Sequence, residues 1–262
     1  MPFLALDAGN SSVKAAVWDG GRWGRVARWP SDDANVEAWA GRLATLAASG
    51  AGGVGVASVV PALTPVLVEA ARAALGAEPV VVSAALPLPF RLAYRTPETL
   101  GADRLAAAVA AWTLEGGDGR PVVALDAGTA ITTDVVAPEP GGAVYLGGAI
   151  LPGPDLLRRA LAGGTGQLPD VPLSADPPPV GTTTAEAIQA GLSALVVGGV
   201  DRLLRQTAGA LGAEPVVVAT GGWAGWLAAR VAGVDRVVPT LVLEGVRQLA
   251  GGEEERRGGE EA

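Results

Sequence analysis

The chain has 262 residues, of which 49% are hydrophobic and 18% are charged, and this composition is typical of a globular protein with one large or two modest domains. It contains no histidine and no cysteine, which excludes thiolate nucleophiles, disulfides, Cys/His zinc sites and acid–base catalysis by histidine. Its net charge of -8 argues against a nucleic-acid partner, because affinity for nucleic acids depends on clustered Lys and Arg.

The first half of the chain alternates short apolar runs with helical patterns, which predicts helices packed against a mixed sheet. Asp19-Gly20-Gly21 has the composition of a hairpin turn. The predicted elements are strands over 3–6, 13–18 and 22–28, a helix over 33–48 capped by Asp32 or Asp33, a strand over 54–60, a helix over 64–75 ending at Gly76, a strand over 80–83, and a helix over 105–114.

The second half again alternates short apolar runs with helical patterns. It begins after the glycines at 116, 117 and 119, where we place a domain boundary. We therefore expect an N-terminal domain over 1–117, a C-terminal domain over 118–250, and a disordered tail over 251–262. The predicted elements are strands over 122–126, 131–136 and 143–150, a helix after Pro154, an irregular segment over 168–181, a helix over 184–211 interrupted at Gly198-Gly199, and a strand over 216–219.

Nothing in the sequence indicates membrane insertion or export. Met1 stands directly before the first predicted strand, without a basic segment or a long apolar segment ahead of it. No apolar run approaches the roughly 18 residues needed to cross a bilayer. We expect a cytoplasmic protein that does not bind membranes.

One short phrase occurs twice, as Leu6-Asp7-Ala8-Gly9-Asn10 and as Leu125-Asp126-Ala127-Gly128-Thr129. Each copy follows an apolar run and precedes hydroxyl residues, which predicts strand, tight turn, strand and indicates an old duplication. Backbone N–H groups of such a turn can surround phosphate oxygens, and the carboxylate can hold a cation against them. Two such turns facing one another, with a third glycine turn at Thr220-Gly221-Gly222, would bind a nucleotide.

Lys14 is the only lysine in the sequence, and it follows the first of these turns. Coding bias toward arginine explains why other lysines are absent, but not why this one is present. Its ammonium group can reach phosphate oxygens as a point charge. The sequence alone leaves both readings of Lys14 open.

Taken together, these motifs closely resemble type III pantothenate kinase, within the acetate and sugar kinase, Hsp70 and actin superfamily. The resemblance covers nearly the whole chain except the tail. The residues that carry it are Asp7 to Lys14, Tyr94, Gly101-Ala102-Asp103-Arg104, Asp126 to Ala130 with Thr132 and Asp134, Gly147-Gly148, Ile150, Pro152-Gly153, Thr184, Ala187-Ile188, Gly191 and Thr220-Gly221-Gly222.

The resemblance implies an α/β fold of two actin-like (ribonuclease H-like) domains, each a mixed sheet flanked by helices. It implies transfer of the ATP γ-phosphate to pantothenate, giving 4′-phosphopantothenate in the first step of coenzyme A biosynthesis, by a homodimer built from the apolar helices that begin at Leu105 and Thr184. Mg²⁺ would accompany ATP near Asp7, and Asp126 would hold a monovalent cation, K⁺ or NH₄⁺. The implied ATP-binding residues are Asp7, Ala8, Gly9, Asn10, Ser11, Ser12, Val13, Lys14 and Thr129. The implied pantothenate-binding residues are Tyr94, Gly101, Ala102, Asp103, Arg104 and Thr184, with Asp103 as the catalytic base.

Each of these residues also has a structural reading. Without histidine, Asp103 is the natural candidate base, and Arg104 beside it can pair with an acidic substrate. Asp103 and Thr184 can equally cap or stabilise their helices, Asp126 can hydrogen-bond its own turn, and Tyr94 can simply pack. Two departures from the family pattern are Ser11 where Thr is usual and Thr183 where Asn is common.

Two other functions stay open at this point. One is a kinase for another small hydroxylated acid, because a fold does not fix a substrate. The other is a nucleotide-binding regulatory protein without catalysis. Asp103 and the negative net charge argue against the second.

Overall fold

The computed structural model describes residues 1–48 and 50–260. It has the mixed α/β fold that the sequence predicts, with two mixed sheets flanked by helices. The first part of the chain forms β1 (Phe3–Ala8), β2 (Ser12–Trp18), β3 (Ala27–Pro30), α1 (Val36–Leu46), β4 (Gly53–Ser58), α2 (Thr64–Leu75), β5 (Val80–Val81), β6 (Arg91–Leu92) and α3 (Ala102–Glu115). The remainder forms β7 (Val122–Ala127), β8 (Ala130–Glu139), β9 (Gly142–Pro152), α4 (Pro154–Gly163), α5 (Thr184–Leu211), β10 (Val216–Thr220), α6 (Ala224–Ala228), β11 (Arg236–Val237) and α7 (Leu241–Glu260).

The two sheets share one strand order. The first sheet runs β3-β2-β1-β4-β5, and the second runs β9-β8-β7-β10-β11 with β6 added beyond β9. In both, the strand that carries the Asp-Ala-Gly phrase pairs antiparallel with the next strand and parallel with the fourth. This common order supports the duplication that the repeated phrase indicates.

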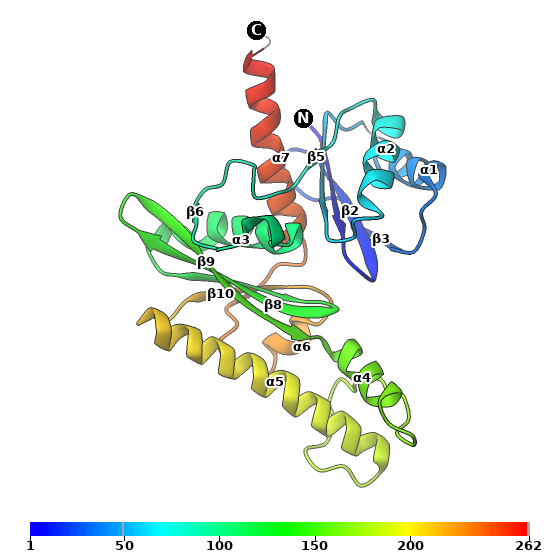
Figure 1. Ribbon diagram of the computed structural model, residues 1–262, viewed down its shortest axis with the longest axis vertical. Coiled ribbons are helices and arrows are strands. Elements are labelled where there is room, and N and C mark those ends of the chain that lie inside the picture. Colours follow the sequence, from blue (N-terminus) through cyan, green and yellow to red (C-terminus); the bar gives the residue numbers. More distant parts are fainter. Residues whose placement is uncertain (49, 261–262) are drawn as a thin grey trace.

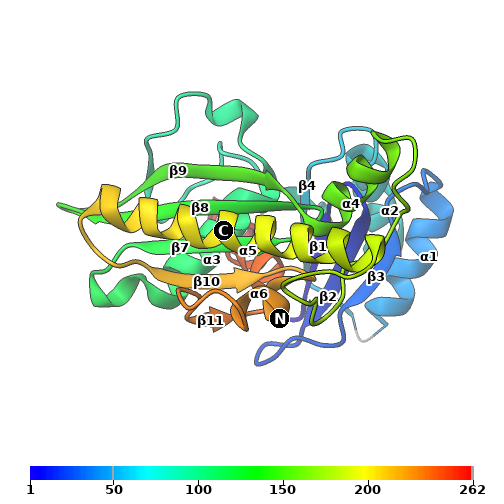
Figure 2. The same ribbon diagram turned by 90° about the horizontal axis from the view of Figure 1, so that it is seen from below.

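Helices and sheets alternate in five layers (Figure 1). Helices α1 and α2 cover the outer face of the first sheet, where Trp39, Leu43 and Leu67 are fully buried. Helices α3 and α7 fill the space between the two sheets. Helix α5 covers the far face of the second sheet, as Figure 2 shows from below, and α6 contributes to the same core.

Each of the two middle helices, α3 and α7, packs mainly on the sheet formed by the other half of the chain. Helix α3 follows the first sheet in sequence but packs on β7 and β8, whereas α7 follows the second sheet but packs on β1 and β4. The helices also pack on each other so closely that a Cβ on Gly245 would lie 1.9 Å from the carbonyl oxygen of Ala106. Helix α3 packs on α7 with one face and on β7 and β8 with another, and only small side chains fit at such close approach. This packing explains the Ala-rich composition of α3.

The exchange bears on the predicted domains. Because β6 joins the second sheet and α7 packs on the first, the two halves are interlocked, and the boundary after residue 117 stays a prediction. Helix α7 continues to Glu260, past the point at which the sequence indicates a disordered tail, and residues 261–262 lie outside the described residues. Helix α3, one of the two expected dimer helices, is instead buried inside the chain.

Several local predictions need correction. The third strand begins at Ala27 rather than residue 22, because Trp23 makes only an isolated bridge with Trp18. The cap of α1 is Asn35, whose side chain accepts the N–H of Ala38, and not Asp32 or Asp33. Helix α5 runs through Gly198-Gly199 without a break because residues at every fourth position are buried on both sides of the two glycines, among them Val196 and Val200 in the core with the second sheet. Helix α3 begins at Ala102, earlier than expected.

Helix α5 is long and apolar enough to cross a membrane by length and composition, contrary to the expectation that no segment reaches that threshold. Among the described residues it is the one helix that passes this test. Its buried stripe is Ile188, Leu192, Val196, Val200, Leu204 and Ala208. Val196, Val200 and Leu204 share a core with β7, β8 and β10, whereas Ile188 and Leu192 line the groove beside α4. Such packing is the ordinary reason for an apolar core helix.

Candidate active site

The first Asp-Ala-Gly turn places a carboxylate beside the lysine. Asp7 in β1 and Lys14 in β2 are direct cross-strand partners, so both side chains lie on one face of the sheet. Lys14 Nζ lies 3.0 Å from Asp7 Oδ2, and Asp7 is buried. Between the strands, the Gly9 N–H donates to the carbonyl oxygen of Ser12 at 3.1 Å and closes the turn.

The second turn repeats the frame without the lysine. Asp126 in β7 stands opposite Thr132 in β8, and the Gly128 N–H closes the turn on the carbonyl oxygen of Ala130 at 2.9 Å. No described residue hydrogen-bonds the buried Oδ1 atom of Asp126. The third glycine turn covers this carboxylate: Gly221 has a φ of +93°, and a Cβ there would lie 2.4 Å from Asp126 Oδ1.

The two turns meet across the space between the sheets. Ser11 Oγ and Thr129 Oγ1 share a hydrogen bond of 2.8 Å. Ser11 stands where threonine is usual in the family pattern, and it still supplies the hydroxyl group for this contact. A small cavity of about 110 Å³, which we call the central cavity, lies at their junction. Its lining is Asp7, Gly9, Asn10, Ser11, Ser12, Lys14, Arg28, Val59, Asp103, Asp126, Gly128, Thr129, Ala130, Thr132 and Gly222.

Most residues predicted to bind ATP therefore line one cavity. Ala8 and Val13 do not, because their side chains are fully buried in the core beneath α1 and α2. They can serve the turn only through their backbone. The structure thus brings the two turns together, which is the arrangement that nucleotide binding by both would require.

The charges in the central cavity are coupled. Burial raises the pKa of Asp126 to about 7, Lys14 opposes that rise, and Asp7 and Asp103 add to it. Burial alone would lower the pKa of Lys14, but attraction by Asp7 and Asp126 raises it above the ordinary value. Two carboxylates thus attract the ammonium group of Lys14, and Asp103 lines the same cavity, which makes the cavity attractive to further cations.

Asp103 lies in the first turn of α3, with its side chain facing the central cavity. Its carboxylate does not cap the helix; it accepts the backbone N–H of Arg104 at 2.7 Å. Burial raises the pKa of Asp103, and the charge of Asp7 adds to that rise against the opposing effect of Arg104. A carboxylate whose pKa is raised in this way is suited to accept a proton near neutral pH.

A buried network fixes Arg104. Its Nε and NH2 groups donate to Asp134 Oδ1 at 3.0 and 2.8 Å, and the hydroxyl of Tyr145 donates to the same oxygen at 2.6 Å. Burial raises the pKa of Asp134 to about 6, against the attraction of Arg104. Tyr94 packs edge-on against Tyr145, with ring centroids 6.0 Å apart. The side chain of Tyr94 also interacts directly with the Arg104 guanidinium and helps to raise its pKa, so these two predicted residues are brought together.

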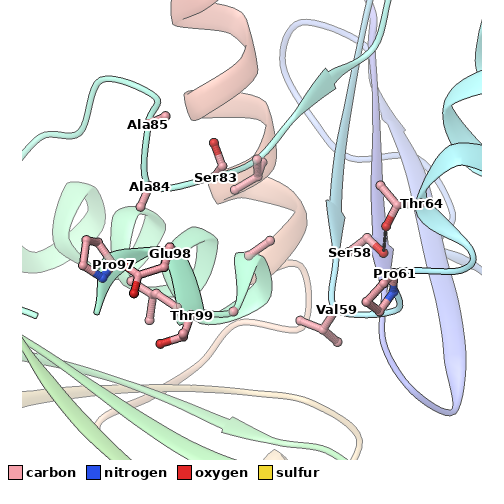
Figure 3. Close-up of a pocket in the computed structure, with 14 residues that line it drawn as sticks. Ser58, Val59, Pro61, Thr64, Ser83, Ala84, Ala85, Pro97, Glu98 and Thr99 are labelled. Atoms are coloured by element: carbon pink, nitrogen blue, oxygen red, sulfur yellow. Dashed lines mark hydrogen bonds between the residues drawn. The ribbon is translucent and has the colours of Figure 1, made fainter. Parts of the chain in front are cut away.

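A second cavity of about 810 Å³, the lateral cavity, adjoins the central one at Val59. Figure 3 shows Ser58, Pro61 and Thr64 on one side of it and Pro97, Glu98 and Thr99 on the other. Gly101 and Ala102 also line it, whereas Tyr94 and Arg104 do not. The four residues of the Gly-Ala-Asp-Arg motif therefore face three different surroundings.

A third cavity of about 640 Å³, the outer cavity, shares the hydroxyl ends of both turns with the central one. It contains residues that sequence reasoning missed, because they come from distant elements without a local motif. Its lining is Ser11, Ser12, Arg28, Trp29, Pro30, Gly128, Thr129, Asp155, Arg159, Gly222 and Trp223.

Thr184 lies apart from these cavities. It is the first residue of α5, on the other face of the second sheet from α3 (Figure 1), and it lines an apolar groove between α4 and α5. The cap of α5 is Thr183, which forms a capping box with Glu186. Thr183, and not Thr184, is therefore the N-cap of α5. The Thr184 hydroxyl makes no hydrogen bond within the described residues.

The residues present can be tested against the implied cations. Within residues 1–48 and 50–260, no group of three or more acidic side chains forms a cluster that could hold a metal. Mg²⁺ in kinases needs only one or two carboxylates together with substrate phosphates, so Asp7 fits that use. The unpartnered, buried Oδ1 of Asp126 fits a monovalent cation, which would supply the missing partner.

Comparisons with known proteins agree with this geometry. The sequence pattern of type III pantothenate kinase matches residues 3–206. The type III pantothenate kinase of Moorella thermoacetica is 35% identical over 251 residues, covering 93% of this chain and 96% of that protein. That of Acidiphilium cryptum is 34% identical over 254 residues, covering 94% and 93%.

Solved structures show the same fold. A conserved Campylobacter jejuni protein, provisionally named a Baf family transcriptional activator, has a TM-score of 0.60 at 21% identity, covering 96% of this chain and 99% of that one. A ROK hexokinase from Thermus thermophilus has a TM-score of 0.50 at 19% identity, covering 97% and 100%. These likenesses confirm the actin-like fold class and no more. The chain belongs to the type III pantothenate kinase family, the ATP-dependent enzymes that phosphorylate pantothenate at the first step of coenzyme A biosynthesis.

Proposed function

We propose that this kinase transfers the γ-phosphate of ATP to the primary hydroxyl of pantothenate with Asp103 as the general base. The observation that carries the proposal is the central cavity, which Asp103 shares with Lys14 and both Asp-Ala-Gly turns. Phosphoryl transfer depends mainly on positioning and charge neutralisation, so a carboxylate, two phosphate-binding turns and cations form an adequate set. Asp103 accepts the hydroxyl proton as the oxygen attacks, and its raised pKa favours that step.

The first turn binds the phosphates of ATP through Asp7 to Lys14, and Thr129 contributes from the second turn. The Ser11–Thr129 hydrogen bond holds the turns at one distance, so phosphate oxygens can contact both. Lys14 supplies positive charge to the transferred phosphate while Asp7 keeps it in place.

Pantothenate lies against Gly101, Ala102 and Arg104. The Arg104 guanidinium has five N–H donors. It uses two nitrogen atoms for Asp134 and also interacts with Tyr94, and its remaining donors can bind the carboxylate of the substrate. Tyr94 closes the same region through its contact with Tyr145. This acid-binding role argues for pantothenate over a neutral sugar.

Two cations assist. Asp126 would hold K⁺ or NH₄⁺, and Asp7 would hold Mg²⁺ that accompanies ATP. Bound there, these ions would neutralise phosphate charge during transfer. The central cavity has three acidic side chains against two basic ones, Lys14 and Arg28, so bound cations would also help a polyanion to enter.

Thr184 reaches pantothenate from a second copy of the chain in a homodimer. Support comes from its free hydroxyl on α5, away from Asp103, and from the apolar α4–α5 groove beside it, where Leu195 is exposed. We expect Leu195→Glu to convert the dimer to a monomer in analytical ultracentrifugation. The enzyme is expected to work in the cytoplasm, without nucleic acid or membrane.

The direct test measures ADP release over a panel of hydroxy acids, in K⁺ or Na⁺, for the wild type and Asp103→Asn. We expect activity with pantothenate alone in the panel, higher in K⁺. The asparagine variant should lose about 10²- to 10⁴-fold in kcat, the usual contribution of a general base. Full activity of Asp103→Asn, or no ADP release with pantothenate, would refute the proposal.

A further inference from the structure

Two arginines of the outer cavity have no part in the reaction as described so far. Arg28 comes from β3 and Arg159 from α4, so they approach from the two halves of the molecule. The cavity's volume of about 640 Å³ lies within the usual range of ligand pockets, about 300 to 1,000 Å³. With the reacting phosphate proposed in the central cavity beside Asp103, we place the rest of the nucleotide in the outer cavity, which shares Ser11, Ser12 and Thr129 with the central one.

Arg28 stands where the two cavities join. The register pairs Asp7 with Lys14 and Lys14 with Arg28, so these three side chains form a row across β1, β2 and β3. Arg28 Nε donates to Ser12 Oγ at 3.0 Å, which orients the guanidinium over the first turn. No acidic side chain among the described residues forms a salt bridge with it, so its terminal NH groups are free for a ligand.

Arg159 faces it from α4. The neighbouring Arg158 is held by Asp155 and Asp170, whereas Arg159 is exposed and pairs with no described acidic residue. Asp155 also accepts the indole N–H of Trp223 at 3.2 Å, which fixes one wall of the cavity. Trp29 also lines the cavity, and its ring is fixed edge-on against Trp39, with centroids 5.7 Å apart.

The charge of the site explains why more than one cation is needed. Lys14 is already paired with Asp7, and Asp103 and Asp126 add negative charge. A guanidinium presents a planar fork that matches two phosphate oxygens, unlike the point charge of lysine. We propose that Arg28 and Arg159 clamp the α- and β-phosphates of ATP from the two halves, in the cavity that Trp29 and Trp223 also line; this clamp rests on the proposed use of ATP.

The clamp is tested by calorimetric titration of Mg·ATP and of adenosine without any acceptor. The variants are Arg28→Gln, Arg159→Gln and their combination. Arg25→Gln is the matched control, because Arg25 is exposed three residues before Arg28 and lines none of these cavities. We expect each clamp variant to weaken Mg·ATP binding about 10-fold, as loss of a charged hydrogen bond does. Binding of adenosine should change less than about twofold, because adenosine lacks the phosphates.

Arg28→Lys keeps the positive charge but loses the planar shape of the guanidinium, so it separates these two effects. It also keeps the clamp testable if the glutamine variant misfolds. It should bind Mg·ATP more weakly than wild type and more tightly than Arg28→Gln. Equal affinity of Arg28→Gln, Arg159→Gln and Arg25→Gln for Mg·ATP would overturn the clamp, as would an equal loss for adenosine. Pantothenate turnover by the wild type is measured in parallel, so failure of the acceptor assignment is seen separately from failure of the clamp.

Discussion

The two Asp-Ala-Gly turns share a frame but surround their carboxylates differently. Asp7 faces Lys14 at 3.0 Å, whereas Asp126 faces Thr132 and keeps a buried oxygen without a partner. Burial then raises the pKa of Asp126 to about 7. The shared strand order fixes where each carboxylate stands, and the residue on the neighbouring strand decides what that carboxylate can do.

The two turns also differ in length. The first turn spans residues 9–11 between its strands, and the second has only Gly128 and Thr129. The extra residue shifts the register, so Lys14 comes seven positions after its aspartate and Thr132 six positions after the other. One turn can thus bind phosphate through a lysine, and the other is left to hold a cation.

The largest expected effect comes from removing the lysine. Lys14→Gln would take positive charge from the transferred phosphate and leave Asp7 without its cation. We expect kcat/KM for ATP to fall about 10²- to 10³-fold, as when one preorganised transition-state contact is lost. ADP release measures this, with Arg25→Gln as the charge-matched control and a melting curve to confirm folding. A loss no greater than that of the control would show that the two turns do not differ in this way.

A second difference between the two carboxylates can be tested through the free energy of unfolding of Asp126→Asn. The folded pKa of about 7 lies above the ordinary value of 3.8, so this group's contribution to stability is full below about pH 4 and is lost as pH rises through about 7. Without K⁺ or NH₄⁺, the variant should therefore be more stable than wild type at pH 8, by on the order of 1 to 4 kcal/mol, and nearly equal at pH 4. Urea unfolding at both pH values checks this, and a difference independent of pH would contradict it.

A smaller effect is expected at the glycine that covers Asp126. Gly221→Ala would place a Cβ 2.4 Å from Asp126 Oδ1 at a φ of +93°, so we expect a loss of about 1 to 3 kcal/mol in the free energy of unfolding. Gly222→Ala is the matched control, because a Cβ there meets nothing within 4 Å. Equal melting temperatures for the two variants would show that the second turn is not packed in this way.

Local sequence predicted the features that depend on local chemistry. The turns follow from Asp and Gly after apolar strands, and the end of α2 follows from Gly76, which adopts the left-handed conformation. The cap of α1 was predicted wrongly because a run of four residues offers three that suit a cap, Asp32, Asp33 and Asn35, and Asp33 instead accepts the N–H of Asn35. Position within such a run depends on how the helix packs.

Features built from distant elements could not be predicted in the same way. The exchange of α3 and α7 between the sheets depends on packing of segments from opposite ends of the chain. The Arg104–Asp134–Tyr145 network joins α3, β8 and β9. The sequence did hold one signal: Asp134 lies inside the buried strand β8, and a buried carboxylate needs a partner. The sequence does not indicate which residue that partner is.

The most direct test of the different tasks of the two turns is a K⁺ titration of ADP release with pantothenate. It compares wild type, Lys14→Gln and Asp126→Asn at saturating Mg·ATP. We expect the relative activation by K⁺ over Na⁺ to persist in Lys14→Gln, at much lower rates, and to disappear in Asp126→Asn. Loss of K⁺ activation in Lys14→Gln together with its persistence in Asp126→Asn would contradict the assignment of the cation to the second turn.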